Sequence, residues 1–289
     1  MDPDSGTHQR RLNCPPQDVA GRNGGQQAAG IARIRSDATV ANALRDSGLG
    51  MSDAANAAKH GVAIKTIRRW RRLYQRQGVP RGQVHLQATC PRCGGGVLDG
   101  SAYVELLGWY LGDGHITPGR RGVYALHVVN DVKYVQLNAR IQVLMRRVKL
   151  NSRPHARFRP GCVVTTVSWK HWPCLFPQHG PGRKHERELT LECWQKELIE
   201  RYPADFLRGL FHSDGCRAKN WATRTVAGER KRYDYPRWHF SNNSKDIMRW
   251  CQETLDLLEI PWRQSSWKTL SVSTKAGVAR LDGLIGLKN

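Results

Sequence analysis

Two related segments in one chain constrain its fold more than any other feature of the sequence. The first copy opens with Leu106-Leu-Gly-Trp-Tyr-Leu-Gly-Asp-Gly114, and the second opens with Leu207-Arg-Gly-Leu-Phe-His-Ser-Asp-Gly215. Each is an apolar, helix-like run that stops at Asp-Gly. A match of this kind at two distant places predicts that one structural unit is built twice.

The segments that follow the two openings also correspond. Leu126-His-Val-Val-Asn-Asp131 is echoed by Trp238-His-Phe-Ser-Asn-Asn243. Each echo is followed by apolar residues at helical spacing (132–148 and 244–258) and then by a segment of strand character (153–169 and 262–274). The order predicts helix, two strands, helix, two strands, helix, formed twice. The expected fold class is therefore α+β, with two pseudo-symmetric αββαββα repeats preceded by a small all-α domain.

Glycines inside the two opening helices need a reason, because each costs about 1 kcal/mol relative to alanine in a helix. If the two helices lie side by side, Gly108 and Gly209 allow their backbones to touch, with Gly112 and Ser213 one turn further on. We expect both helices to end at the Asp-Gly pairs, where glycine adopts a positive φ. The glycine spacing predicts a helix–helix interface.

Close packing of these helices would bring Asp113 and Asp214 together. Two like charges held close are unfavourable unless cations lie between them. One Asp-Gly turn alone would indicate only a helix end. The matched pair indicates a cation site.

In these motifs the chain resembles the LAGLIDADG (DOD-type) homing endonuclease family in its single-chain, two-repeat form, over residues 101–289. The resemblance implies a saddle of antiparallel sheet over double-stranded DNA, with the motif helices packed at the pseudo-twofold axis. It implies Mg²⁺ or another divalent cation bound by Asp113 and Asp214, with the carbonyls of Gly112 and Ser213 as further ligands. The implied function is that of a mobile-element nuclease, a metal-dependent hydrolase that makes site-specific double-strand breaks.

The family also places a basic residue near each scissile phosphate, and aligning the repeats nominates Lys184 and Lys288 as catalytic residues. Arg187 is an alternative to Lys184, and solvated charges near a turn are an alternative for both lysines. The motif helices depart from the family pattern at Trp109, Arg208 and His212. Arg208 and His212 are four residues apart, so we expect them to face solvent or to lie near the aspartate pair.

A large excess of positive charge, 46 Lys and Arg against 24 Asp and Glu, predicts a polyanionic partner such as nucleic acid. Strand alternation predicts that Trp238 and Phe240 point toward the helices. The alternate residues of the same strand, Lys231, Tyr233, Tyr235, Arg237 and His239, then point toward DNA. Which parity of the preceding strand faces DNA, that of Arg217 or that of Arg224, stays open. The predicted DNA contacts in the repeats are Lys170, Arg217, Lys219, Lys231, Tyr233, Tyr235, Arg237, His239 and Lys275.

Residues 54–70 have the layout of a helix-turn-helix. Ala57 allows two helices to approach, Gly61 allows a tight turn, and Val62, Ile67 and Trp70 supply a buried side. This arrangement would direct Lys65, Arg68, Arg69 and Arg72 toward DNA. A single basic amphipathic helix is the alternative.

The predicted domains are a disordered basic tail (1–37), the helix-turn-helix (38–78), a linker (79–100) and the two repeats (101–200 and 201–289). Within the linker, Cys90-Pro-Arg-Cys93 is half of a zinc knuckle. Zinc needs about four ligands, and no second pair of ligands lies nearby in the sequence. Only His85 or the distant Cys14 could join. We therefore expect a relic turn rather than a structural zinc site.

Scattered cysteines and the lack of a long apolar run or signal peptide favour a cytoplasmic, nucleoid-associated protein, expected to be a monomer. The alternative function is a transcription regulator that keeps the fold for DNA binding alone, although such regulators have lost the motif acids that this chain keeps. An RNA maturase is a third reading. The sequence does not support an intein or a serine or cysteine hydrolase.

Overall fold

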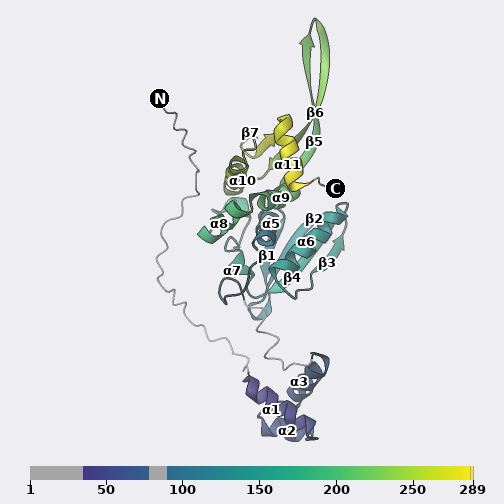
Figure 1. The fold of residues 1–289 in the computed structure, drawn as a ribbon, viewed down its shortest axis with the longest axis vertical. Helices are drawn as coiled ribbons and strands as arrows, with labels where there is room; N and C mark the ends of the chain where they lie inside the picture. The colour runs from purple at the N-terminus through teal and green to yellow at the C-terminus, as the bar shows by residue number, and fades with distance from the viewer. Residues whose placement is uncertain (1–34, 78–89, 287, 289) are drawn as a thin grey trace, which may run out of the picture. The chain divides into compact units, whose positions relative to one another are not determined.

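The structure is a computed structural model that describes residues 35–77, 90–286 and 288. It contains two compact units, one with helices α1–α3 and one with the elements from α5 onward, and each is described by itself (Figure 1). Residues 1–34 of the predicted tail and residues 79–89 of the predicted linker lie outside the described residues. Within those residues, no helix combines the length and the apolar character needed to cross a membrane.

The smaller unit consists of α1 (Asp37–Gly48), α2 (Asp53–Lys59) and α3 (Ile64–Gln77). The hydroxyls of Ser36 and Ser52 cap α1 and α2 by accepting from backbone N–H groups. Gly61 lies between α2 and α3 with φ +58°, a conformation that favours glycine. The hydrophobic core of this unit consists of Val40, Ala43, Ala57, Ile67 and Trp70. Because α2 and α3 are separate helices, the single-helix alternative is wrong.

The first repeat runs from the N-terminal motif helix through one four-stranded sheet. Its elements are α5 (Gly100–Leu111), β1 (Gly114–Pro118), β2 (Tyr124–Asp131), α6 (Val135–Val148), β3 (His155–Arg159) and β4 (Cys162–Trp169). Short helices follow: α7 (Trp172–Leu175), the 3₁₀ turn Lys184–Glu186 and α8 (Cys193–Arg201).

The second repeat has the same order. Its elements are α9 (Pro203–Asp214), β5 (Gly215–Val226), β6 (Glu229–Ser241), α10 (Lys245–Leu257), β7 (Arg263–Ser266), β8 (Thr269–Val272) and α11 (Lys275–Ile285). Both sheets are antiparallel with matching strand orders, β1-β2-β4-β3 and β5-β6-β8-β7. The α+β class with a duplicated αββαββα unit is confirmed. One difference is that β5 has 12 residues where β1 has 5, so the β5–β6 hairpin projects well beyond its sheet (Figure 1).

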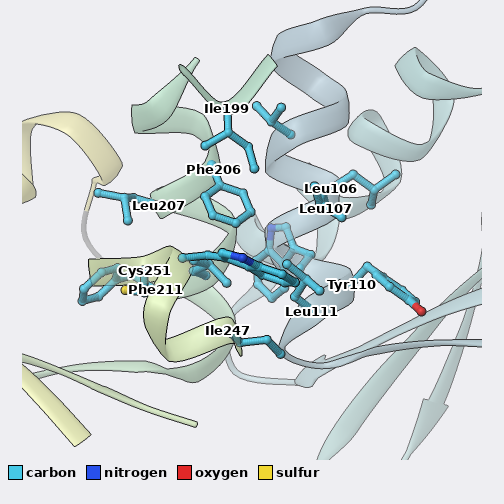
Figure 2. Close-up of a cluster of buried hydrophobic side chains, with 14 of the residues drawn as sticks. Leu106, Leu107, Tyr110, Leu111, Ile199, Phe206, Leu207, Phe211, Ile247 and Cys251 are labelled. Carbon is cyan, nitrogen blue, oxygen red and sulfur yellow. The ribbon is translucent and has the colours of Figure 1, made fainter. Parts of the chain in front are cut away.

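Helices α5 and α9 lie side by side within the main core (Figure 2). A Cβ added at Gly209 would lie 2.2 Å from the Glu105 carbonyl oxygen, and one at Gly108 would lie 2.7 Å from the Leu210 nitrogen. Real side-chain carbons do not approach this closely, so the two backbones touch at these glycines. Leu106, Leu107, Phe206 and Leu207 are among the fully buried residues around them.

Glycine is required after each of the two aspartates, but not for the positive φ that we expected from the sequence. Gly215 has φ −91°, and Gly114 is not among the residues with positive φ. A Cβ at Gly114 would lie 2.5 Å from the Tyr110 Cα, and one at Gly215 would lie 2.4 Å from the Phe211 carbonyl oxygen. The expectation of a positive φ is therefore wrong. Glycine is needed because each strand leaves against the last turn of its motif helix.

We expect Gly209→Ala to lower the free energy of unfolding by about 1–3 kcal/mol, the usual cost of overpacking a close-packed interior. Gly283→Ala is the matched control, because Gly283 lies in α11 with nothing within 4 Å of an added Cβ. That control should be neutral or stabilising by up to about 1 kcal/mol. Urea denaturation of both variants measures the difference, and equal midpoints would contradict the close approach.

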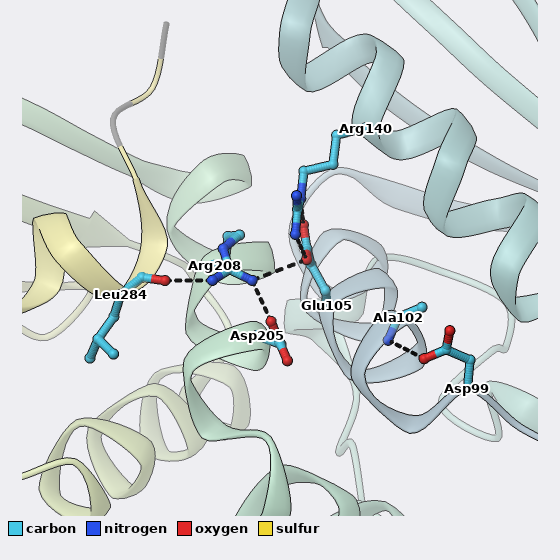
Figure 3. Close-up of polar contacts among 7 residues, drawn as sticks. All are labelled: Asp99, Ala102, Glu105, Arg140, Asp205, Arg208 and Leu284. Atoms are coloured by element: carbon cyan, nitrogen blue, oxygen red, sulfur yellow. Dashed lines mark hydrogen bonds and ion pairs between the residues drawn. The ribbon is translucent and has the colours of Figure 1, made fainter.

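An ion-pair network lies in the N-terminal halves of the motif helices (Figure 3). It includes Glu105, whose carbonyl oxygen makes the close contact with Gly209. Glu105, 1% exposed, accepts from Arg140 of α6 and from Arg208 of α9. Arg208 also donates to Asp205 and to the Leu284 carbonyl. Asp99 begins α5 by accepting from the Ala102 N–H at 3.1 Å. The network connects α5, α6, α9 and α11, so it joins the two repeats.

Two of the three departures from the motif, Arg208 and His212, were expected to face solvent or to lie near the aspartate pair, and both are largely buried. Arg208 is held in this network, and His212 is buried and packs against Trp109 with ring centroids 6.2 Å apart. Burial lowers the pKa of His212 to about 4, so its ring is neutral at neutral pH. Of the two alternatives, facing solvent or lying near the aspartate pair, the first is wrong, because Arg208 is held by Glu105, Asp205 and the Leu284 carbonyl and His212 is buried.

Candidate active site and nucleic-acid interface

The two motif aspartates lie at the C-terminal ends of the paired helices. Asp214 is the last residue of α9, and Asp113 directly follows Gly112, the residue that caps α5. A Cβ at Gly112 would lie 2.1 Å from the Ser213 Oγ and 2.9 Å from the Asp214 Oδ2. The two helix ends are therefore in direct contact. Asn242, directly after β6, donates from Nδ2 to the Asp214 Oδ2 at 2.7 Å.

Electrostatics at this junction follow from burial and from the proximity of like charges. Burial, followed by the negative charge of Asp113, raises the pKa of Asp214 to about 6. Burial also raises the pKa of Asp113. The positive charges of Lys184 and Lys288 act in the opposite direction on both acids. Each acid is thus costly to ionise in the protein alone, which is the condition under which a bound cation is favoured.

Lys184 and Lys288 occupy equivalent places in the two repeats. The Lys184 ammonium donates to the carbonyls of Tyr110, Leu111 (2.8 Å) and Gly112 (3.2 Å) at the end of α5. The Lys288 ammonium donates at 3.1 Å to the carbonyls of Ser213 and Gly215 at the end of α9. Burial lowers the pKa of Lys184 to about 8 and also lowers that of Lys288. Both cations complement the negative ends of the helix dipoles.

Arg187, the alternative to Lys184, is engaged elsewhere. Its guanidinium donates to the Gln178 carbonyl, and its charge acts on Tyr110 rather than on either aspartate. Arg187 thus acts on the Tyr110 side chain, whereas Lys184 contacts the backbone carbonyls at the end of α5.

The donor set at the junction fits a hard divalent cation. Carboxylate and carbonyl oxygens are the ligands that Mg²⁺ and Ca²⁺ prefer, and Asp113, Asp214, Gly112 and Ser213 supply them at adjoining helix ends. The Gly112 and Ser213 carbonyls already accept from Lys184 and Lys288. Each carbonyl oxygen has a second lone pair that remains for a cation.

A cleft opens beside Asp214 and is lined from both repeats. Its charged and polar lining includes several residues that the sequence did not single out. These are Arg183, His185, Ser241, Asn242, Asn243 and Lys268. Ser241, Asn242 and Asn243 had a sequence signal, because they belong to the echo Trp238–Asn243 that corresponds to Leu126–Asp131 of the first copy.

The two faces of the second sheet are settled by cross-strand pairs. Trp238 and Phe240 are fully buried against α9, as predicted. Arg217 pairs with Trp238 across β5 and β6, and both side chains donate to Asp282 of α11. Arg217 therefore belongs to the helix-covered side, together with Lys219 by alternation. Arg224 and the residues that alternate with it along β5, such as Asn220, lie on the exposed side of the sheet.

That exposed side carries the remaining nominated residues of the second sheet. Tyr235, Arg237 and His239 are half-buried there, opposite Asn220, Ala218 and Cys216. The Tyr235 hydroxyl accepts from Asn220 at 3.3 Å and from Arg237 at 3.2 Å. Lys231 and Tyr233 continue the same side along the hairpin and are exposed. Outside the sheets, Lys170 follows β4 and Lys275 begins α11, and both are exposed.

The corresponding face of the first sheet was missed in the sequence. His127, the equivalent of His239, stacks on His115 with ring centroids 4.6 Å apart and lies 2.9 Å from the hydroxyls of Thr117 and Thr166. A groove on this face is lined by His127, Lys149, Arg153, His155, Arg157, Arg159 and Thr166. The repeated histidine was the signal that could have found it.

In the smaller unit, the nominated residues of α3 are all exposed: Lys65, Arg68, Arg69 and Arg72. Arg68 and Arg71 both pair with Asp53 at the start of α2. Lys65, Arg69 and Arg72 remain as the cationic face of this helix.

Comparison with known proteins gives structural neighbours alone: no family model matches, and no curated protein matches. The chain is similar to the homing endonuclease I-DmoI in complex with DNA and Ca, at 12% identity and a TM-score of 0.40, covering 64% of this chain and 89% of that chain. It is similar to the LAGLIDADG meganuclease I-AabMI bound to uncleaved DNA (11% identity, TM-score 0.40, 63% and 82% covered). It is also similar to the N-terminal LAGLIDADG domain of WhiA (13% identity, TM-score 0.41, 71% and 90% covered).

Proposed function

We propose that this chain is a site-specific, divalent-metal-dependent endonuclease acting on double-stranded DNA. The observation that carries the proposal is the pairing of Asp113 and Asp214 at touching helix ends, where each is costly to ionise without a cation. One such acid lies in each repeat, which suits cleavage of both strands of a DNA duplex. Two sheets with exposed basic faces, one per repeat, supply the surface for DNA.

A divalent cation held by Asp113, Asp214 and the carbonyls of Gly112 and Ser213 would supply an activated water and stabilise the leaving oxygen. The chain's own residues prepare that site. Asn242 fixes the orientation of the Asp214 carboxylate by donating to its Oδ2. Lys184 and Lys288 hold a positive charge at each helix end, close to where a phosphate would lie between the repeats. At neutral pH Lys184 stays mostly protonated, because its pKa is about 8.

The DNA-facing set that we propose in the second repeat is Asn220, Arg224, Lys231, Tyr233, Tyr235, Arg237 and His239. Arg217 and Lys219 are left out of it because Arg217 is bound to Asp282 on the other side of the sheet. In the first repeat we add the groove around His127. Polar groups held by their neighbours, such as Arg237 on Tyr235, suit base reading, whereas the exposed cations suit phosphates.

The projecting β5–β6 hairpin makes the proposed DNA surface asymmetric. We expect Arg224→Ala/Lys231→Ala, a cross-strand pair on the exposed side, to weaken DNA binding and to reduce the slope of log affinity against log salt by about 0.9 per lost phosphate contact. Arg146→Ala/Arg280→Ala removes two exposed cations from the helical side and should leave the slope unchanged. Fluorescence anisotropy over a salt series makes the comparison, and equal slopes for both double variants would contradict the assignment.

One observation favours a second candidate, a transcription regulator that binds DNA without cutting it. The ammonium groups of Lys184 and Lys288 lie on Gly112 and Ser213, the carbonyls that a cation would use. A lysine at such a place can substitute for a metal as a neutralising charge. The exposed cationic face of α3 would add affinity in either case.

A binding selection followed by a metal addition separates the candidates. Duplexes that the protein selects from a random library are isolated and then incubated with Mg²⁺. We expect a recurrent motif that is cut on both strands. A recurrent motif that stays intact supports the regulator, and a preference for structured RNA over every duplex would overturn both in favour of a maturase role.

A further inference from the structure

A second group of metal-binding side chains lies away from the aspartate pair. Cys90, Cys93, His171 and Cys174 each offer a ligand atom, and these four atoms all lie within 4.8 Å of one another. The expectation that Cys90-Pro-Arg-Cys93 lacks a second ligand pair is therefore wrong. The partner pair is His171-Trp-Pro-Cys174, which is distant in sequence and was invisible to a search for nearby cysteines.

The spacing of the four atoms suits a tetrahedral ion. At the tetrahedral angle, Zn–S bonds of about 2.3 Å and Zn–N bonds of about 2.0 Å place neighbouring ligand atoms about 3.5–3.8 Å apart. The Cys174 Sγ lies 3.8 Å from the His171 Nδ1, so this pair needs almost no adjustment. Closing the remaining separations, none above 4.8 Å, needs side-chain shifts of about 1 Å. Three thiols and one imidazole are ligands that select zinc over magnesium or calcium.

The backbone on both sides holds these side chains in place. The Cys90 carbonyl accepts from the N–H groups of Gly94 (2.9 Å) and Gly96 (3.3 Å). Gly95 between them has φ +68°, which lets the chain fold back tightly after Cys93. This turn runs into the start of α5 through residues that the structure describes without a break.

The second ligand pair is fixed by a buried tryptophan. Trp172, between His171 and Cys174 in sequence, is fully buried and donates from Nε1 to the Val167 carbonyl at 2.7 Å. Pro173 lies in the first turn of the short helix α7. Cys90 is 2% exposed. A buried thiol grouped with two others and an imidazole is an arrangement that metal binding explains and that apolar packing does not.

We propose that Cys90, Cys93, His171 and Cys174 form a structural zinc site. All four coordination positions are taken by protein, so the site has no open position for catalysis. Zinc binding releases the thiol protons and gives a Cys₃His site of net charge −1. The ion is held by a Cys-x-x-Cys pair and a His-x-x-Cys pair that are distant in sequence. The proposal does not depend on the nuclease function.

Zinc content of the full-length protein tests the site directly. We expect about one zinc per chain, measured by plasma mass spectrometry after purification without chelator. Cys93→Ser/Cys174→Ser should lower this to near zero. Cys162→Ser, which removes a half-buried thiol outside the group, should keep it. A double variant that retains a full equivalent of zinc overturns the assignment.

Cobalt substitution keeps the test decisive if the double variant does not fold. Wild-type protein stripped of zinc and titrated with Co²⁺ should develop sulfur-to-cobalt charge-transfer bands and the intense visible bands of a tetrahedral ion, saturating at one equivalent. Adding Zn²⁺ should bleach them. Protein without zinc after growth in zinc-supplemented medium, and without these bands on Co²⁺ addition, would overturn the proposal while leaving the aspartate site untouched.

Discussion

Replacing Asp214 by Asn is expected to abolish double-strand cleavage while leaving target binding in place. The substituted amide has nearly the same shape and keeps an oxygen that can accept from Asn242, which donates to the Asp214 Oδ2 at 2.7 Å. It loses the negative charge that would hold a cation. We expect a loss of at least about 10³-fold in cleavage rate, since even one neutral hydrogen-bond donor in an active site can contribute 10²–10³-fold.

Asp113→Asn should behave in the same way, because each acid contributes to a shared site at the touching helix ends. Glu197→Gln, which neutralises an exposed acid on α8, is the matched control and should cut at the wild-type rate. Cleavage is followed on a selected duplex under single-turnover conditions, and binding on the same duplex by anisotropy. Wild-type cleavage by either aspartate variant would remove these residues from the site.

The same Asp214→Asn substitution is expected to stabilise the protein in the absence of added divalent metal. Burial and the charge of Asp113 raise the pKa of Asp214 from 3.8 to about 6. A carboxyl whose pKa is raised on folding destabilises the folded state once it ionises. A shift of about two units corresponds to about 3 kcal/mol at 1.36 kcal/mol per unit, which is the expected order of the gain above pH 6.

The pH dependence of this gain identifies its cause. Below the unfolded pKa of 3.8 the wild-type carboxyl is protonated in both states, so ionisation contributes nothing to the difference between the proteins. The gain should grow as the pH rises from about 4 to about 6 and then stay constant. Urea denaturation of both proteins across that range, in buffer without added divalent metal or chelator, measures it. A gain that does not vary with pH would show that the aspartate is not electrostatically strained.

Added Mg²⁺ should reduce the difference in free energy of unfolding between the variant and the wild-type protein by stabilising the wild-type protein. A cation that binds the folded wild-type protein stabilises it by mass action, and the variant lacks half of the carboxylate pair. Function and stability are thus in opposition at this junction: the charge that the proposed chemistry needs is the charge that the metal-free fold resists.

The sequence predicted the duplicated fold because the repeats share both an apolar pattern and a downstream order. The close approach of α5 and α9 was readable from Gly108 and Gly209, since glycine within a helix needs a packing reason. The orientation of Trp238 and Phe240 followed from strand alternation. These features depend on local periodicity, which a single sequence displays directly.

Structural features that depend on contacts between residues distant in sequence could not be predicted from the sequence. The role of Arg208 follows from Glu105 and Leu284, which are distant in sequence. The parity of β5 became clear from Asp282 of α11, to which Arg217 and Trp238 both donate. The cysteine–histidine group combines Cys90 and Cys93 with His171 and Cys174, which are distant in sequence. Spacing along the chain carries no signal for such pairs.

A cleavage selection tests the central claim, that Asp113 and Asp214 form a metal-dependent nuclease site, most directly. Purified protein is incubated with a randomised duplex library and Mg²⁺, the cut ends are captured and sequenced, and the Asp113→Asn/Asp214→Asn double variant is run in parallel. We predict recurrent ends at one sequence from the wild-type protein and none from the double variant. The same recurrent ends from both proteins, or none from a wild-type protein that binds a defined duplex, would contradict it.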